Sequence, residues 1–123
     1  MKRPTRRFTV LEQTFGLAVE FYCGTPQSTA LRRCVAVLQL DQNDPENAPD
    51  EGDAAWAMCY NSRAIVWIED ATDIGSLVHE LYHVTAHVLR HIESNDEETG
   101  AYIQSYLFRE AWLRLNKQPK HKP

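Results

Sequence analysis

DIGSLVHELYHVTAHVLRHI, residues Asp73 to Ile92, is the stretch that decides the fold. Its large apolar residues recur every three or four positions, which predicts a helix with one buried face. Asp73 is the expected N-cap of this helix. His79 and His83 fall on roughly the opposite side from the apolar face. We therefore expect the apolar face to pack on a sheet and the two histidines to line a cleft.

The segments before this helix have the pattern of strands. The apolar runs 54–60 (AAWAMCY) and 64–69 (AIVWIE) are separated by three polar residues, which predicts a hairpin or two neighbouring strands. Residues 8–21 are rich in β-branched and aromatic residues and predict one or two further strands. Thr25 and Pro26 then have the pattern of an N-cap followed by the first helical residue, for a helix to about residue 40. A strand is the competing interpretation of residues 35–40 (VAVLQL).

A second long helix is expected from about residue 96 to residue 115. The order of elements predicts an α+β domain, in which a small mixed sheet packs on the histidine-bearing helix and on a following antiparallel helix. The 123 residues fit one domain. We expect it to have flexible basic termini at about 1–6 and 117–123 and an acidic loop at 41–53.

Composition excludes several classes of function. The net charge of −4 gives no overall field that would attract nucleic acid or an anionic membrane, so neither is an expected partner. No secretory signal and no apolar run of membrane-spanning length is visible. Cys23, Cys34 and Cys59 match no metal-binding spacing, and we interpret them as reduced thiols of a cytoplasmic protein.

The HELYH motif at residues 79–83 carries the chemistry. Two histidines four residues apart project from one face of a helix and can reach one zinc ion. Glu80 is offset around the helix axis, so it lies beside the metal, where it could accept a proton from a zinc-bound water. The competing interpretation is an exposed, histidine-rich helix face, because His87 and His91 continue the same spacing.

A catalytic zinc site needs a third protein ligand. The second helix opens with DEETGAYIQSYL, and if the chain reverses between the helices its first turns approach the end of the first helix. Glu98 shares a stripe with the small residues Ala101 and Ser105 and is the preferred third ligand. Glu97, on a neighbouring stripe, is the alternative. Acidic residues in a first helical turn also suit the helix dipole without any metal.

The segments GSLVHELYHVTAHVL and DEETGAYIQSYL together resemble the zincin metallopeptidases of the gluzincin type, in the compact form found among phage and bacterial proteins and distantly similar to ImmA/IrrE-type peptidases. The resemblance covers about residues 54–115. It implies peptide hydrolysis at a zinc ion, with Glu80 as general base. It also implies an edge strand beside the cleft, for which we expect residues 64–70 (AIVWIED), and a peptide or protein substrate bound there by strand addition.

Tyr102 is a second catalytic candidate under this resemblance, because zincins commonly use a tyrosine or histidine to stabilise the oxyanion. A tyrosine at helical spacing is more often part of the core. Two functions stay open. The chain is a zinc peptidase with His79, His83 and Glu98 as ligands, or it is a catalytically silent zincin-like module that binds metal or a protein partner. No second lobe follows the motif, so a protein partner could supply specificity.

Overall fold

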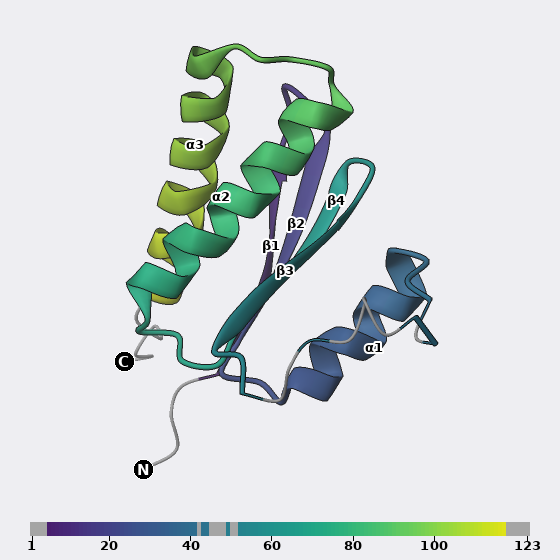
Figure 1. Cartoon of the computed structure of the whole chain (residues 1–123). Helices are drawn as coiled ribbons and strands as arrows, with labels where there is room; N and C mark the ends of the chain where they lie inside the picture. Colours follow the sequence, from purple (N-terminus) through teal and green to yellow (C-terminus); the bar gives the residue numbers. More distant parts are fainter. Residues whose placement is uncertain (1–4, 42, 45–48, 50–51, 118–123) are drawn as a thin grey trace.

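A computed structural model gives the fold, and it describes residues 5–41, 43–44, 49 and 52–117. Four strands and three helices are described, and Figure 1 shows the helices on the two sides of one sheet. In chain order they are β1 (Arg6–Glu12), β2 (Leu17–Cys23), α1 (Gln27–Val37), β3 (Ala55–Tyr60), β4 (Arg63–Ile68), α2 (Ile74–His91) and α3 (Glu97–Leu115). This arrangement confirms the predicted α+β class.

The sheet is mixed and has the strand order β1-β2-β4-β3. β1 and β2 form an antiparallel hairpin, β2 and β4 pair in parallel, and β3 and β4 form a second antiparallel hairpin. The second hairpin turns at Asn61, whose φ of 52° is tolerated better by asparagine than by most residues. The edge strands of the described sheet are therefore β1 and β3.

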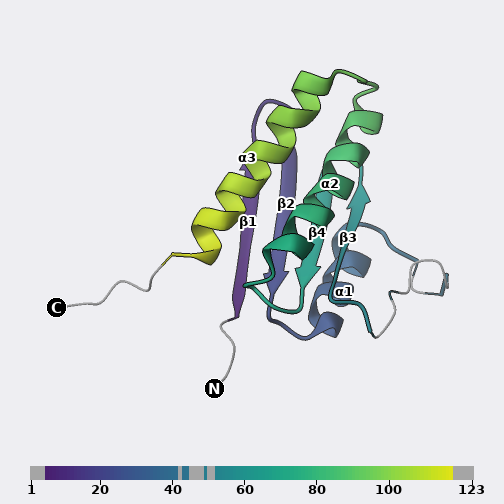
Figure 2. The ribbon, with the colours of Figure 1, turned by 60° about the vertical axis from the view of Figure 1, so that its left-hand side comes forward.

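Helices α2 and α3 lie antiparallel on one face of the sheet, and α1 lies on the other (Figures 1 and 2). The larger core forms between the sheet and the helix pair, where α2 buries Leu77, Leu81, Val84 and Val88 and α3 buries Ile103, Leu107 and Ala111. The smaller core lies under α1, where Trp56 and Trp67 stack with ring centroids 6.1 Å apart. α2 lies against β3 and β4, whereas α3 lies against β1.

Several sequence-based expectations need correction. Residues 64–70 do not form the edge strand, because β4, which contains most of them, is paired on both sides, and β3 takes the edge position instead. Helix α1 begins at Gln27 and ends at Val37, and Thr25 does not cap it. Asp73 does cap α2 as expected, accepting a hydrogen bond from the Ser76 N–H.

The expected basic termini lie largely outside the described residues, although Arg6 already belongs to β1. The acidic loop at 41–53 is described only in part. Within the described ranges, every helix is too short or too polar to cross a bilayer.

Glu12, at the end of β1, fastens the first hairpin to α3. Its side chain is only 2% exposed, and its carboxylate accepts hydrogen bonds from the backbone N–H groups of Thr14 and Phe15 at 2.8 and 2.9 Å. The Tyr102 hydroxyl donates a third at 3.1 Å. Burial opposes ionisation, but these hydrogen bonds outweigh it and lower the pKa of Glu12 below its usual value.

We expect Glu12→Ala to lower the free energy of unfolding by about 2 to 3 kcal/mol, because three donors lose a buried acceptor. Urea unfolding followed by circular dichroism measures this change. Since the folded-state pKa is lowered, the stabilisation by Glu12 is complete above the unfolded-state pKa of about 4.3 and is lost as the pH falls through the folded-state value. Glu97→Ala, at an exposed position, is the control and should cost less than about 0.5 kcal/mol. Equal effects of the two substitutions would contradict this role of Glu12.

Candidate active site

The structure brings His79 and His83 together on the exposed face of α2. Their Nε2 atoms lie 3.1 Å apart, and the ring centroids are 4.7 Å apart. Two nitrogens bound to one tetrahedral zinc at 2.0–2.1 Å would be separated by about 3.3 Å. The observed separation is close to this value, and it is also the length of a hydrogen bond between the two rings. Their position away from the core was predicted from the sequence.

Glu80 lies beside the histidine pair but is turned inward. Its side chain is 7% exposed. Burial raises the pKa of its carboxyl above the usual value, the nearby His79 and His83 act in the opposite direction, and the negative charge of Asp53 raises it further. A carboxylate with a raised pKa is a better proton acceptor than an exposed one, which suits a general base.

A cleft of about 480 Å³ runs between α2 and the edge strand β3. On the β3 side it is lined by the small residues Ala55 and Ala57 together with Trp56 and Cys59. The α2 side contributes His79, Glu80, His83, Ala86, His87 and Arg90. The small side chains leave room beside the histidines for an extended chain.

Cys59 is the one thiol that lines this cleft. Burial raises its pKa to about 11, with Arg90 acting in the opposite direction. The thiol is therefore protonated near neutral pH, and it is neither an activated nucleophile nor a ready thiolate ligand.

Among the described residues, β4 is the only strand that pairs with β3, and the other side of the β3 backbone faces the cleft. The Glu69 N–H donates to the Ala54 carbonyl at 2.8 Å, which fixes the alternation of the β3–β4 ladder. In this register Ala55, Ala57 and Cys59 direct their N–H and C=O groups away from β4. The same three residues line the cleft with their side chains, so the free edge and the cleft coincide.

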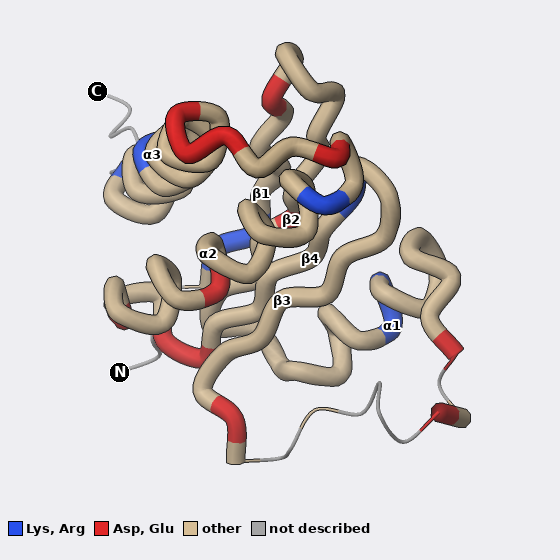
Figure 3. The backbone as a smooth tube through the Cα atoms, turned by 45° about the horizontal axis from the view of Figure 1, so that its top comes forward, with Lys and Arg blue, Asp and Glu red and all other residues tan. Residues whose placement is uncertain are grey.

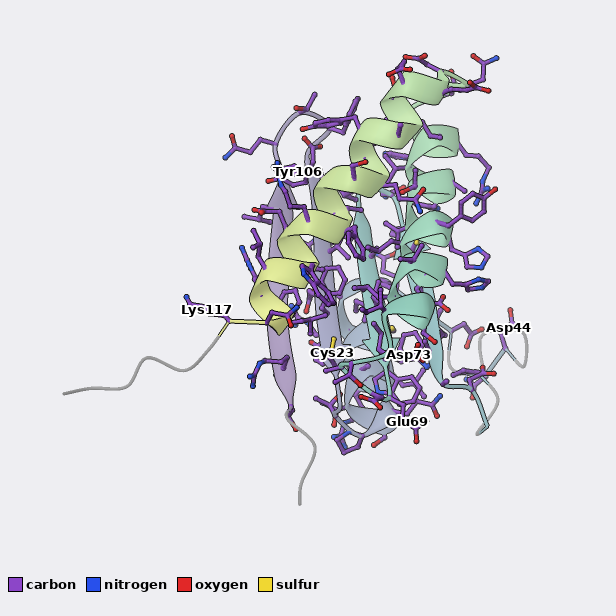
Figure 4. The ribbon with its side chains drawn as sticks, turned by 90° about the vertical axis from the view of Figure 1, so that its left-hand side faces the viewer. Cys23, Asp44, Glu69, Asp73, Tyr106 and Lys117 are labelled. Carbon is purple, nitrogen blue, oxygen red and sulfur yellow. The ribbon has the colours of Figure 1, made fainter. Side chains whose placement is uncertain are left out.

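The opposite edge of the sheet is covered. Tyr106 of α3 donates from its hydroxyl to the Leu11 carbonyl at 3.0 Å, and Arg114 donates to the Thr9 carbonyl. Figure 4 shows Tyr106 on α3 beside β1. α3 thus protects the edge at β1 from pairing with another strand, whereas no helix or strand of the described residues pairs with the outer side of β3.

The third ligand predicted at Glu98 is not brought to the histidine pair. Glu98 is exposed in the first turn of α3, and Asp96 accepts a hydrogen bond from its N–H. Among the described residues, no three His, Cys, Asp or Glu side chains come together in a way that could hold a metal ion. The alternative ligand, Glu97, is therefore not placed beside the histidine pair either. Gly100 approaches Leu89 and Thr85, so α3 packs on the flank of α2 away from β3.

Tyr102 does not face the cleft either, because its hydroxyl donates to Glu12 at the end of β1. The expected oxyanion donor is therefore a structural tyrosine in this arrangement. His87 is nearer the site: its Nε2 lies 2.9 Å from the Asn61 carbonyl at the β3–β4 turn. That contact joins the far end of the cleft to the edge strand.

Sequence reasoning missed Asp53 and Cys59. Asp53 precedes β3 and acts on the charge of Glu80, and Cys59 lies in the cleft wall. The alternation of small residues in AAWAMCY was the only signal for the cleft wall, and it could have been used once β3 was assigned to the edge. Figure 3 shows acidic positions on the described ends of the loop before β3 and at the start of α3.

No family model matches the chain, and no curated protein or solved structure matches it either.

Proposed function

We propose that this chain is a zinc-dependent metallopeptidase that cleaves an extended peptide laid against β3. The observation that carries the proposal is the coincidence of the free β3 edge with the HELYH face of α2. The free backbone groups of Ala55, Ala57 and Cys59 supply a template for strand addition. Along the same cleft lie two imidazole nitrogens 3.1 Å apart and one buried carboxylate.

His79 and His83 would hold the metal, which when bound would supply a polarised water and a Lewis acid for the scissile carbonyl. Glu80 is placed to accept a proton from that water and to donate it to the departing amine. β3 holds the substrate backbone extended through its outward N–H and C=O groups. The small side chains of Ala55 and Ala57 keep the backbone close to the histidines.

Hydrolysis of a mixture of internally quenched fluorescent peptides by the zinc-loaded chain tests this function. We expect cleavage that is abolished by a chelator and restored by zinc. Stoichiometric zinc binding without cleavage of any peptide would contradict the peptidase.

A second candidate is a zincin-like module that binds a peptide strand without cleaving it. The lack of a third ligand beside His79 and His83 in the described residues favours this function. Peptide binding that survives Glu80→Gln, with no turnover in the native chain, would support it over the peptidase.

The source of the third ligand is tested by zinc affinity. If the first turn of α3 moves to the histidines when metal binds, Glu98→Gln weakens zinc binding at least tenfold, while Glu97→Gln does not. Equal zinc affinity of Glu98→Gln and the native chain would exclude Glu98 as a ligand.

A further inference from the structure

A second cavity lies on the opposite face of the sheet from α2 and α3. Helix α1 packs mainly on β4, and the smaller core also contains Tyr22 of β2 and Trp56 of β3, whereas the described residues show no comparable packing of α1 on β1. The cavity there has a volume of about 440 Å³. Its described lining residues are Arg7, Phe8, Thr9, Ala18, Glu20, Arg33 and Arg63.

The strand register explains why the space exists. Thr9 on β1 lies opposite Glu20 on β2, and Ala18 on β2 lies opposite Arg63 on β4. The short side chains of Thr9 and Ala18 form the bottom of the cavity, and the side chains around them are longer. Three arginines line the sides of the cavity: Arg7 from β1, Arg63 from β4 and Arg33 from α1.

Glu20 fixes one of the three arginines in place. Its Oε1 atom accepts hydrogen bonds from Arg33 Nε at 2.8 Å and from the Tyr22 hydroxyl at 3.0 Å. Only 17% of the Glu20 side chain is exposed, so this ion pair is partly shielded from water. Arg33 binds Glu20 through Nε, so its two terminal nitrogens take no part in this ion pair.

Arg7 is held by a different contact. Its guanidinium lies 4.9 Å from the centroid of the Tyr22 ring, a cation–π arrangement that orients the group without using its N–H donors. The described lining therefore holds three guanidinium groups and one carboxylate, a net of two positive charges. The guanidinium groups repel one another when the cavity is empty, and a bound anion would reduce this repulsion.

We propose that this cavity binds the phosphate group of a small phosphorylated molecule. A phosphate monoester carries a charge of about −1.5 to −2 at neutral pH and three strong acceptor oxygens. These match the net charge and the three separate arginine donors, whereas a carboxylate has one charge and two oxygens. Guanidinium groups also bind phosphate in a bidentate manner.

The size and isolation of the site favour a small ligand over a nucleic acid. A volume of 440 Å³ lies within the range of small-molecule sites. Nucleic acids are bound by charge that extends along a groove or face, and the chain as a whole is acidic. This site is independent of the proposed peptidase, because its residues lie on the other face of the sheet.

Titration calorimetry of the full chain with inorganic phosphate and with pyrophosphate tests the proposal. EDTA is added so that neither ligand acts through a metal. We expect saturable binding of both, with a Kd for pyrophosphate that rises at least tenfold in Arg63→Gln. Amide NMR shifts on titration should map to Thr9 and Ala18 and not to His79. Arg32→Gln is the control, since Arg32 lies on α1 beside Arg33 but does not line the cavity.

Circular dichroism checks that Arg63→Gln keeps its fold; if it does not, the NMR map of the native chain decides. Four results would overturn the proposal. They are no saturable binding up to 10 mM ligand, equal weakening in Arg32→Gln, binding of succinate as tight as that of pyrophosphate, and tighter binding of a single-stranded oligonucleotide.

Discussion

Glu80→Gln is expected to lower kcat for peptide hydrolysis by about 10³-fold while zinc stays bound. General bases contribute about 10²- to 10⁴-fold to such reactions, and glutamine keeps the shape of the side chain but cannot accept the proton. Glu80 is buried beside the histidines, and the contact between the His79 and His83 rings does not involve it. Replacing Glu80 by glutamine should therefore leave the two imidazoles in place. Single-turnover assays on the zinc-loaded variant measure the effect.

The same substitution has a second expected result, which separates a catalytic role from a structural one. The folded state raises the pKa of Glu80, mainly through burial, so ionised Glu80 destabilises the zinc-free fold above that pKa. Glu80→Gln should therefore raise the free energy of unfolding of the zinc-free protein at pH 8. The gain should disappear at a pH below about 4, where the carboxyl is protonated in both states.

Glu69→Gln is the matched control, because Glu69 is exposed just after β4 and does not line the cleft. Its hydrolysis rate should equal that of the native chain. Glu80→Gln with full activity would remove Glu80 from the mechanism. A variant that loses both activity and stability would show that Glu80 supports the fold instead.

Ala57→Pro is expected to lower kcat/KM by about 100-fold with the fold retained. The Ala57 N–H points away from β4, so proline removes no bond of the sheet, and edge strands tolerate proline at such positions. A substrate strand, however, loses a backbone donor and meets the proline ring at the edge. The loss of one or two hydrogen bonds and of close approach accounts for the expected size.

Two controls make this substitution specific. Met58→Pro should unfold the hairpin, because Met58 lies at an alternate position of the ladder, where the N–H pairs with β4. A peptide substrate N-methylated at single positions should reproduce the loss in the native chain at the residues that pair with β3. Unchanged kcat/KM in Ala57→Pro would contradict strand addition at this edge.

The helices, and the side of α2 on which the histidines lie, could be predicted from the spacing of apolar residues along the sequence. Leu77, Leu81 and Val88 repeat at helical spacing, and this repeat placed His79 and His83 on the exposed side. Local signals of this kind depend on residues three or four apart, which the sequence displays directly. The strands could be predicted from similarly local patterns, which gave one or two strands for residues 8–21 and a hairpin or two neighbouring strands for residues 54–69.

The order of the strands could not be predicted in this way. The apolar runs of β3 and β4 are similar in composition, and which of them borders the cleft depends on the parallel pairing of β4 with β2, across about forty residues of chain. The antiparallel packing of α3 on α2 was predicted, but the direction in which Glu98 points depends on tertiary contacts in the same way. Gly100 fits against Leu89 and Thr85, and Tyr102 reaches Glu12, so tertiary contacts turn α3 toward β1 and carry Glu98 away from the pair.

Zinc content by elemental analysis, with affinity measured by competition against a chelating dye, tests the central claim most directly. The native chain should hold one zinc ion per chain after dialysis, and His79→Ala and His83→Ala should each hold none. His91→Ala should keep its zinc, because His91 lies on α2 but not in the cleft lining. A native chain without stoichiometric zinc, or one that loses its zinc equally through His91→Ala, would contradict the account.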